Sequence, residues 1–385
     1  MMRNFLIILA LSIVAVSCQN QQSSISYLIT KLGEDTLAIE RFQISENEMK
    51  ADVILRSPIT SLKSYTLTWN EATNIQSMNV TDHTLKRSFK EEGQTIQKII
   101  NKGDSLEVIY ITNKGDRVSQ LPNRENLIPF IDMVHWPYEI AFKRAHLSPN
   151  DSIDQYMITG RRNSNFIIHR LDDISYSLRH PSRGVMQVTT SYEGELMSLD
   201  AKATTRKVKV ERAFDLEFDK LANSLTQRDI SGSTFGSLSP AVINKYHFAN
   251  TYFQVSYGSP AKRGREIFGG IVSYGERWRT GANRATHFKS SSDLTIQGKN
   301  LPAGEYTLFT IPEKDGGTLI INQQIGQNGR SYDEFQDIMR VEMSRSDYNY
   351  EIESFTITID ETDSGGRLGL KWDQTIYYID FSINP

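Results

Sequence analysis

The chain has 385 residues, with 43 Lys and Arg against 46 Asp and Glu, and its formal net charge is -3 at pH 7. Its basic residues are scattered along the chain, so there is no electrostatic basis for nucleic-acid binding. The length allows two domains, and no repeat of 20–50 residues, which would indicate a solenoid or propeller, stands out.

The chain begins with a segment typical of an export signal. Arg3 precedes a largely apolar run at residues 5–16, which is shorter than the roughly 20 residues of a membrane-spanning helix and matches a secretory signal. Ser17 and Cys18 follow this run, and a small residue before a cysteine resembles the lipobox of bacterial lipoproteins. In that family the cysteine is acylated, although the position usually held by leucine is Ala15 here.

Cys18 is the only cysteine of the chain, so an internal disulfide is excluded and a lipid anchor is its simplest use. We expect a signal peptide with a lipidated cysteine at residues 1–18 and a tether at residues 19–24. The protein would then be exported and lipid-anchored in a Gram-negative cell envelope, at the outer membrane. The alternative is an ordinary signal peptide cut nearby, with Cys18 discarded.

Residues 25–222 have the alternating pattern of antiparallel strands. Turn signals at residues 33–35 and 102–104 predict hairpins, and residues 84–90 also fit a strand. One segment, near residues 126–146, fits a helical period instead, and Pro137 should break it. The prediction for this first domain is an α+β fold, a curved antiparallel sheet over one broken helix.

Residues 223–241 are rich in Ser, Gly and Thr and read as a linker. Beyond them, residues 242–385 contain many short strand patterns separated by turn signals, which favour an antiparallel β-sandwich or jelly-roll-like domain. The whole chain is therefore predicted to be mainly β.

The second domain also resembles a known family. The stretches at residues 255–288, 294–322, 332–343, 353–360 and 368–383 resemble, in order, the signature of a bacterial family catalogued as a domain of unknown function, number 2911. The family often has a tryptophan where this chain has Gly316 and Gly317. The resemblance implies the identity of the domain and no biochemical activity.

The densest polar stretch of the chain lies within that signature, in "RWRTGANRATHF" at residues 277–288. Gly281 and Asn283 should form a tight turn because both residues tolerate positive φ. Arginine forks bind carboxylate, phosphate or sulfate, and a tryptophan can form a flat wall for a sugar. We therefore predict a site for an anionic or glycan ligand, or for an envelope protein, built from Lys262, Arg265, Trp278, Arg279, Asn283, Thr286 and His287.

Other interpretations remain open. The stretch could be architectural, with Arg279 paired to Asp337 or Glu342. An envelope hydrolase of glycans or esters could use His287, but no G-x-S-x-G motif is present, so no catalytic residue is predicted. A lipid or lipoprotein carrier would use the first domain and need a large apolar cavity. Metal-ligand spacing is absent, and we expect neither metal nor cofactor.

Overall fold

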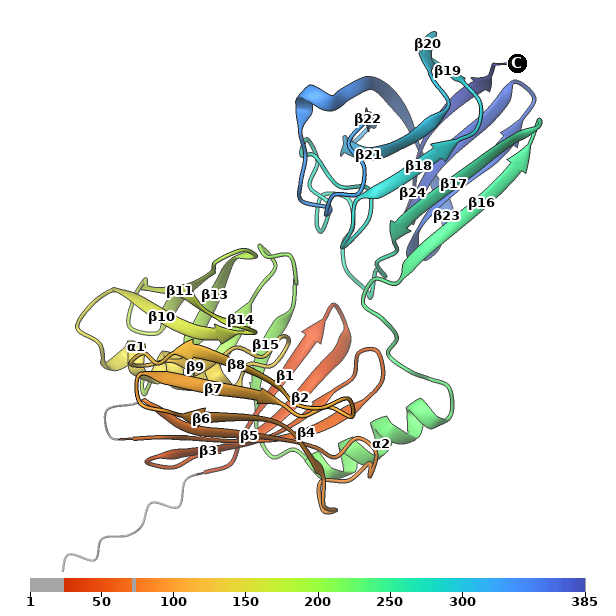
Figure 1. Ribbon diagram of the computed structural model, residues 1–385. Helices are drawn as coiled ribbons and strands as arrows, with labels where there is room; N and C mark the ends of the chain where they lie inside the picture. The colour runs from red at the N-terminus through yellow and green to blue at the C-terminus, as the bar shows by residue number, and fades with distance from the viewer. Residues whose placement is uncertain (1–23, 71–73, 385) are drawn as a thin grey trace, which may run out of the picture.

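The computed structural model describes residues 24–70 and 74–384. The predicted signal peptide, Cys18 and all of the tether except Ser24 lie outside the described residues. The described chain is mainly β and forms an N-terminal domain and a C-terminal domain, each built on one antiparallel sheet (Figure 1). This confirms the predicted fold class. No helix in the described ranges is long and apolar enough to cross a membrane.

The N-terminal sheet has fifteen strands in the order β8-β7-β6-β5-β4-β3-β2-β1-β15-β14-β13-β12-β11-β10-β9. The chain therefore winds outward from β1 to β8, crosses to the opposite edge, and winds back until β15 pairs with β1. All neighbours are antiparallel except β9 and β10. The strands are β1 (Ser26–Leu32), β2 (Asp35–Ile44), β3 (Glu48–Leu55), β4 (Ser61–Trp69), β5 (Ile75–Asp82), β6 (Gln94–Asn101), β7 (Ser105–Tyr110), β8 (Arg117–Pro122), β9 (Ile128–Pro129), β10 (Ser152–Thr159), β11 (Arg162–Arg170), β12 (Ser175–His180), β13 (Gly184–Thr190), β14 (Leu196–Asp200) and β15 (Lys209–Ala213).

Both turn predictions are confirmed. Gly33 and Gly103 have φ of 64° and 89° and join β1 to β2 and β6 to β7. The strand predicted at residues 84–90 is wrong, since these residues form turns. Arg87 there has a φ of 58°, which extended backbone does not allow. Phe89 leaves the sheet and packs on Phe218, with ring centroids 5.5 Å apart.

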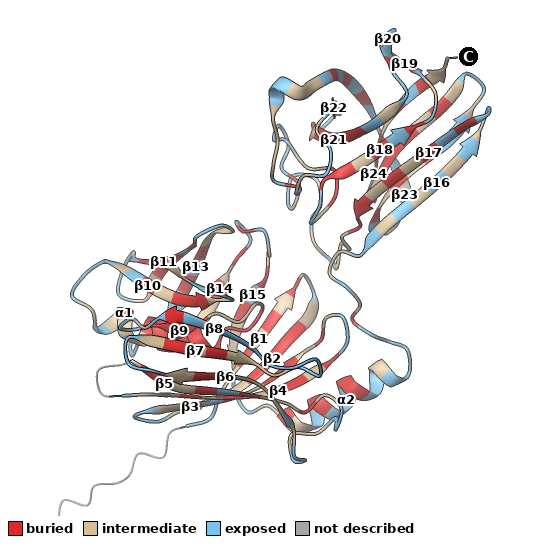
Figure 2. Cartoon of the chain, in the orientation of Figure 1, coloured by how far each residue is buried: buried red, intermediate tan, exposed pale blue. Residues whose placement is uncertain are grey.

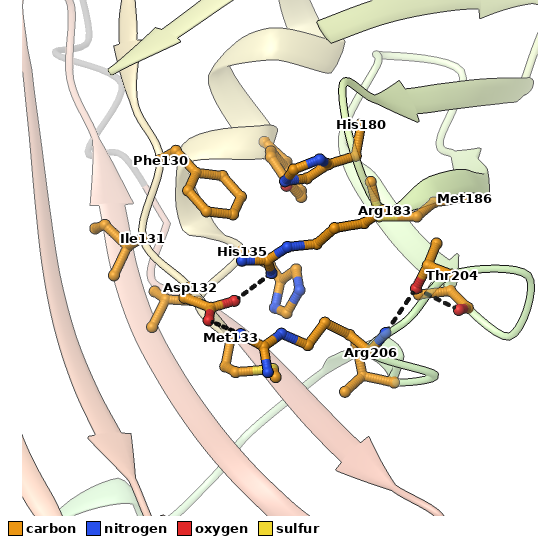
Figure 3. A pocket seen from close by; sticks show the side chains of 14 residues that line it. Phe130, Ile131, Asp132, Met133, His135, His180, Arg183, Met186, Thr204 and Arg206 are labelled. Carbon is orange, nitrogen blue, oxygen red and sulfur yellow. Dashed lines mark hydrogen bonds and ion pairs between the residues drawn. The ribbon is translucent and has the colours of Figure 1, made fainter. Parts of the chain in front are cut away.

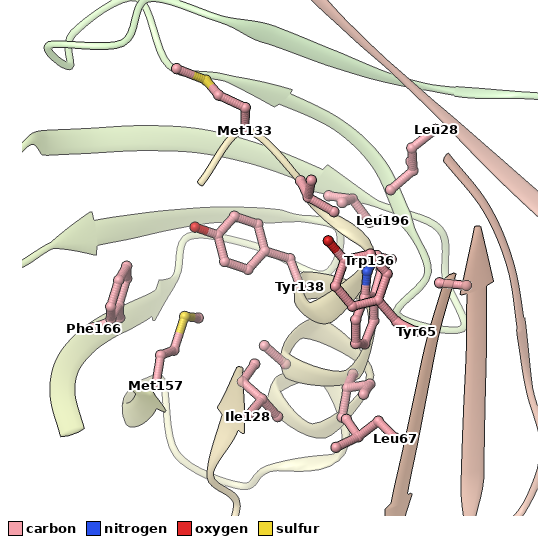
Figure 4. Packing of buried hydrophobic residues seen from close by; sticks show 14 of the residues in the cluster. Leu28, Tyr65, Leu67, Ile128, Met133, Trp136, Tyr138, Met157, Phe166 and Leu196 are labelled. Carbon is pink, nitrogen blue, oxygen red and sulfur yellow. The ribbon is translucent and has the colours of Figure 1, made fainter. Parts of the chain in front are cut away.

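The helix α1 (Trp136–Leu147) lies inside the curve of this sheet and carries much of its core (Figures 1 and 2). Trp136 is fully buried, and its ring centroid lies 5.6 Å from that of Tyr65 (Figure 4). The buried carboxylate of Glu40 accepts the backbone N–H groups of His135 and Trp136 at 2.7–2.9 Å. Glu40 thus caps the helix from a strand far away in the sequence.

The predicted helix near residues 126–146 begins later and is unbroken. Residues 128–129 form β9, and Pro137 lies in the first turn of α1. A proline is tolerated there because the N–H that it lacks has no partner within the helix. The expectation that Pro137 breaks the helix was therefore wrong, and the proline marks the start of the helix instead.

A second helix, α2 (Phe218–Ile230), covers the outer face of β2, β3 and β4. Phe218, Ala222 and Leu225 are buried on one face of the helix, against Ile39, Ile54 and Leu62. The structure thus places the first half of the predicted linker, residues 223–230, in a helix packed on the N-terminal domain. The polar composition of this segment concealed a short apolar face, to which Leu221 also contributes.

The C-terminal sheet has nine strands in the order β16-β17-β18-β21-β22-β23-β24-β19-β20, and it forms a sandwich-like domain with its own core. Two of its strands are long, and register shifts within that hairpin let the strands bend over the core. The strands are β16 (Ala241–Phe248), β17 (Thr251–Gly258), β18 (Thr286–Ser290), β19 (Leu294–Ile296), β20 (Lys299–Leu301), β21 (Gly304–Pro312), β22 (Gly316–Asn322), β23 (Asp337–Thr362) and β24 (Gly365–Ile383), with a 3-10 turn, η1 (Glu334–Gln336), before β23.

Candidate functional site

The stretch at residues 277–288 forms the predicted turn. Gly281 and Asn283 have φ of 147° and 66°, and Thr280 before them is also left-handed at 53°. The buried Thr286 hydroxyl donates to the Thr280 carbonyl at 2.6 Å. A Cβ on Gly281 would lie 3.0 Å from the Gly258 carbonyl oxygen. The turn is thus fixed against the end of β17, and Thr286 serves to hold it.

Lys262 and Arg265 lie in a separate loop and are satisfied within the protein. The Lys262 ammonium contacts Glu351 at 2.5 Å and Asp373 at 2.8 Å. The hydrogen bonds to Asp373 and Glu351 raise the pKa of Lys262. Arg265 folds back on its own loop and donates to the carbonyls of Lys262 and Ala261 at 2.8 and 2.5 Å. Lys262 is thus paired with two carboxylates, and Arg265 is held by two carbonyls of its own loop.

Trp278 packs in an aromatic cluster at the edge of the core. Its ring is stacked on that of Trp372 at 6.2 Å and meets Phe355 edge-on at 4.9 Å. Its backbone forms an isolated bridge with Thr310. The Trp278 ring is half-buried and its contacts are with other aromatic rings. It therefore packs as part of the core and does not form a flat surface for a sugar.

Arg279 differs from the other cations. Its guanidinium is partly buried and donates one hydrogen bond, from Nη1 to the Asn283 carbonyl at 3.3 Å. Within residues 24–70 and 74–384 it pairs with no carboxylate, and Asp337 is held instead by Arg340 at 2.7 Å. Burial lowers the pKa of Arg279, and the positive charge of Arg330 lowers it further. The architectural pairing of Arg279 with Asp337 or Glu342 is therefore not formed.

Arg279 has room at this place because residue 329 is a glycine. A Cβ on Gly329 would lie 2.8 Å from the Arg279 Cδ and also 2.8 Å from the Asn283 carbonyl oxygen. Neither separation is tolerable for a real side chain, so Gly329 lets the loop before β23 close over the arginine. This close approach also brings the next residue, Arg330, near Arg279.

Asn283 and His287 complete the predicted set. The exposed Asn283 amide donates to the Ser239 carbonyl at 3.2 Å. The His287 Nδ1 lies 3.2 Å from the Thr307 hydroxyl, and burial lowers the pKa of the imidazole. His287 has no carboxylate to orient it among the described residues. The structure thus brings Arg279 and Asn283 together. The other predicted site residues make contacts within the protein instead: Lys262, Arg265, Trp278, Thr286 and His287.

Residues 239–381 match the family described as "Protein of unknown function (DUF2911)". This range contains the turn at residues 277–288, the loop of Lys262 and Arg265, and the loop before β23. The C-terminal domain belongs to this family. The match confirms the resemblance drawn from the sequence, and it begins at residue 239, after the N-terminal domain. The comparison with curated proteins gives no match.

Two solved structures show weak similarity to the chain. A DUF1089 family protein from Pseudomonas aeruginosa has 11% sequence identity and a TM-score of 0.31, over 43% of this chain and 90% of that protein. The core factor of S. cerevisiae has 9% identity and a TM-score of 0.10, over 93% of this chain and 57% of that one. Neither likeness is strong enough to carry an argument about fold or function.

The residue that the sequence analysis missed is Arg330, in the loop of the DUF2911 domain before β23. Its guanidinium donates to the Ser182 carbonyl at 2.8 Å and to the Thr205 hydroxyl at 3.3 Å, both in the N-terminal domain. It too pairs with no carboxylate of the described residues. Arg330 is distant in sequence from Arg279, and the only local signal was the Gly329-Arg330 pair in a polar loop.

A second contact joins the DUF2911 domain to the β1–β2 turn. The Glu34 backbone N–H donates to the Arg263 carbonyl at 3.0 Å, and the Arg263 guanidinium contacts Asp35 at 2.5 Å. The same guanidinium stacks over the Phe235 ring, 4.0 Å from its centroid. The loop predicted as part of an anion site therefore binds the other domain.

Proposed function

We propose that this protein is a lipid-anchored envelope protein that binds an anionic ligand or partner through its DUF2911 domain, without catalysis. The proposed binding groups are the guanidinium groups of Arg279 and Arg330, with Asn283 beside them. One observation carries the proposal: Arg279 is partly buried beside a second arginine, and the described residues provide neither with a carboxylate.

The physical argument rests on the cost of an unpaired charge. A buried guanidinium needs a counter-charge or several hydrogen bonds to offset its desolvation, and Arg279 makes one long hydrogen bond. Two neighbouring cations repel each other, and an anion between them reverses the sign of that interaction. Arginine forks bind sulfate, phosphate and carboxylate groups with paired hydrogen bonds. An acidic group on an envelope glycan has the required chemistry.

The test is calorimetric titration of the purified protein with a sulfated disaccharide and with its unsulfated parent. The sulfated sugar should bind and the parent should bind at least about tenfold more weakly, since a charge-assisted hydrogen bond contributes about 1.5–3 kcal/mol. Arg279→Gln and Arg330→Gln should each weaken binding by about tenfold or more. The proposal would be refuted if the protein bound the two sugars with equal affinity. It would also be refuted if Arg279→Gln bound the sulfated sugar as tightly as the unsubstituted protein does.

The envelope part of the proposal rests on the N-terminal sequence. Replacing the proposed acylation site, Cys18→Ser, should abolish incorporation of labelled fatty acid and release the protein from the membrane fraction. A protein that stays in membranes unlabelled would have another form of attachment. The matched variant Ser17→Ala keeps a small residue before the cysteine and should leave labelling intact.

The alternatives receive less support. A hydrolase centred on His287 lacks an orienting carboxylate, and unchanged turnover in His287→Ala would remove that site. A lipid carrier needs a large cavity between the sheet and α1, where Trp136, Phe142 and Phe166 are fully buried. The pocket beside the start of α1 is too small for a lipid, since it encloses only about 30 Å³.

A further inference from the structure

We propose that a pocket in the N-terminal domain is a second binding site, for a small carboxylate with an apolar body. This inference goes beyond the proposed function of the DUF2911 domain and is independent of it. The pocket lies between the segment that leads into α1 and the loops at the ends of β12 and β14 (Figure 3). Its enclosed part is small, about 30 Å³, and it opens to solvent.

Two arginines mark one wall of the pocket. Arg183 and Arg206 both reach Asp132, with Arg183 Nη1 lying 2.6 Å from Oδ1 (Figure 3). Each guanidinium has five N–H donors, and Asp132 accepts from one nitrogen of each. Both arginines therefore keep further N–H donors. Their contacts with Asp132 show that this wall of the pocket can bind a carboxylate.

The local charge favours a second anion. Arg183 and Arg206 face the single carboxylate of Asp132, and Arg330 of the DUF2911 domain reaches Ser182 and Thr205 beside them. Burial lowers the pKa of Arg206, and Asp132 does not offset the burial. A group with one negative charge would neutralise part of this excess.

His180 provides an unused donor in the same pocket. Its side chain is only 8% exposed, and its Nδ1 accepts the Ser182 backbone N–H at 3.1 Å. This hydrogen bond requires a lone pair on Nδ1, so the proton of the neutral ring is on Nε2. The Nε2 atom is buried without a hydrogen-bond partner. Buried donors are nearly always satisfied, and His180 is one of the residues that line the pocket.

The remaining walls are apolar and set the size of the ligand. Phe130, Met133, Met186 and Val208 line the space that the polar groups leave. The enclosed end has room for a group of one to a few water-sized atoms, such as a carboxylate, and the pocket is open to solvent on its other side. These dimensions suit a short organic acid and exclude a lipid with long acyl chains.

Calorimetric titration with hexanoate, acetate and 1-hexanol tests this assignment. Hexanoate should bind, and both acetate, which lacks the apolar body, and hexanol, which lacks the charge, should bind at least about tenfold more weakly. Absence of heat with hexanoate, or equal affinity for hexanoate and acetate, would overturn the proposal.

Variants separate this site from the one in the DUF2911 domain. Arg183→Gln should weaken hexanoate binding by about tenfold or more, whereas Arg179→Gln, an exposed arginine on the same strand region, and Arg279→Gln should not change it. Met186→Trp fills the pocket, keeps every charge and should abolish binding. Met186→Trp therefore tests the site even if Arg183→Gln fails to fold. Retained hexanoate binding in folded Met186→Trp would contradict the assignment.

Discussion

Two basic regions of the DUF2911 domain differ in how their charges are compensated. At the loop of residues 261–265, Lys262 contacts two carboxylates and Arg263 contacts Asp35 of the other domain. At the turn of residues 277–284, Arg279 is also partly buried, yet it meets a carbonyl and a second arginine. The first region is held together by its charges. In the second, Arg279 has no carboxylate partner among the described residues, and we propose that a ligand provides one.

The N-terminal domain repeats this contrast. Glu139 of α1 and Arg212 of β15 are almost fully buried and contact each other at 2.6 Å. The arginines around Asp132 are partly exposed and outnumber it. The compensated pair lies in the interior and has a structural role, whereas the excess of positive charge lies beside the pocket that we propose as a binding site.

The largest expected effect is at the compensated interior pair. Arg212→Met leaves the buried Glu139 carboxylate with the more distant ammonium of Lys143, at 3.6 Å, as its cationic partner, and should lower the free energy of unfolding by about 3–5 kcal/mol. Chemical denaturation measures this change. The double variant Arg212→Met with Glu139→Leu removes both charges and should recover most of the loss. A double variant no more stable than Arg212→Met would show that packing, and not charge, explains the effect.

The next effect is on the pH dependence of stability. Burial, aided by Arg183, lowers the pKa of His180 from 6.5 to about 4. The folded state therefore favours the neutral ring, and stability is complete above pH 6.5 and is lost as the pH falls toward 4. The loss should approach about 1.4 kcal/mol per pH unit. His180→Gln should flatten the slope between pH 6.5 and 4, and an unchanged slope would assign it to another group.

The smallest effect on stability is expected at the compensated loop of residues 261–265, where Glu351, one of the two partners of Lys262, is half exposed. Lys262→Gln removes the contacts to Glu351 and to Asp373. Surface ion pairs contribute little, so the free energy of unfolding should fall by no more than about 1 kcal/mol. Thermal unfolding measures this change. A loss as large as that in Arg212→Met would mean that this loop is as critical as the interior.

Much of the architecture could be predicted from the sequence because it depends on local patterns. The alternation in residues 251–258 matches the burial pattern of β17, and Gly33 and Gly103 mark hairpin turns. The start of α1 could not be predicted, because Glu40, which caps it, comes from a strand far away in the sequence. The helix α2 was missed because its buried face contains only a few apolar residues among polar ones.

The candidate site was predictable in part. Gly281 and Asn283 indicated the turn that carries Arg279. The pairing of Lys262 and the proximity of Arg330 to Arg279 depend on contacts between distant loops, which one sequence does not reveal. The pocket lined by Asp132, Arg183 and Arg206 could not be predicted for the same reason, because three segments that are separated in the sequence meet there.

The most direct test compares Arg279→Gln with Lys262→Gln in calorimetric titrations with the same sulfated disaccharide. Both variants remove one positive charge from the same domain, so a general effect of net charge is equal in the two. We predict that Arg279→Gln weakens binding by about tenfold or more and that Lys262→Gln binds as the parent protein does. An equal loss in both variants, or a loss in Lys262→Gln alone, would contradict the claim that the uncompensated arginine is the binding group.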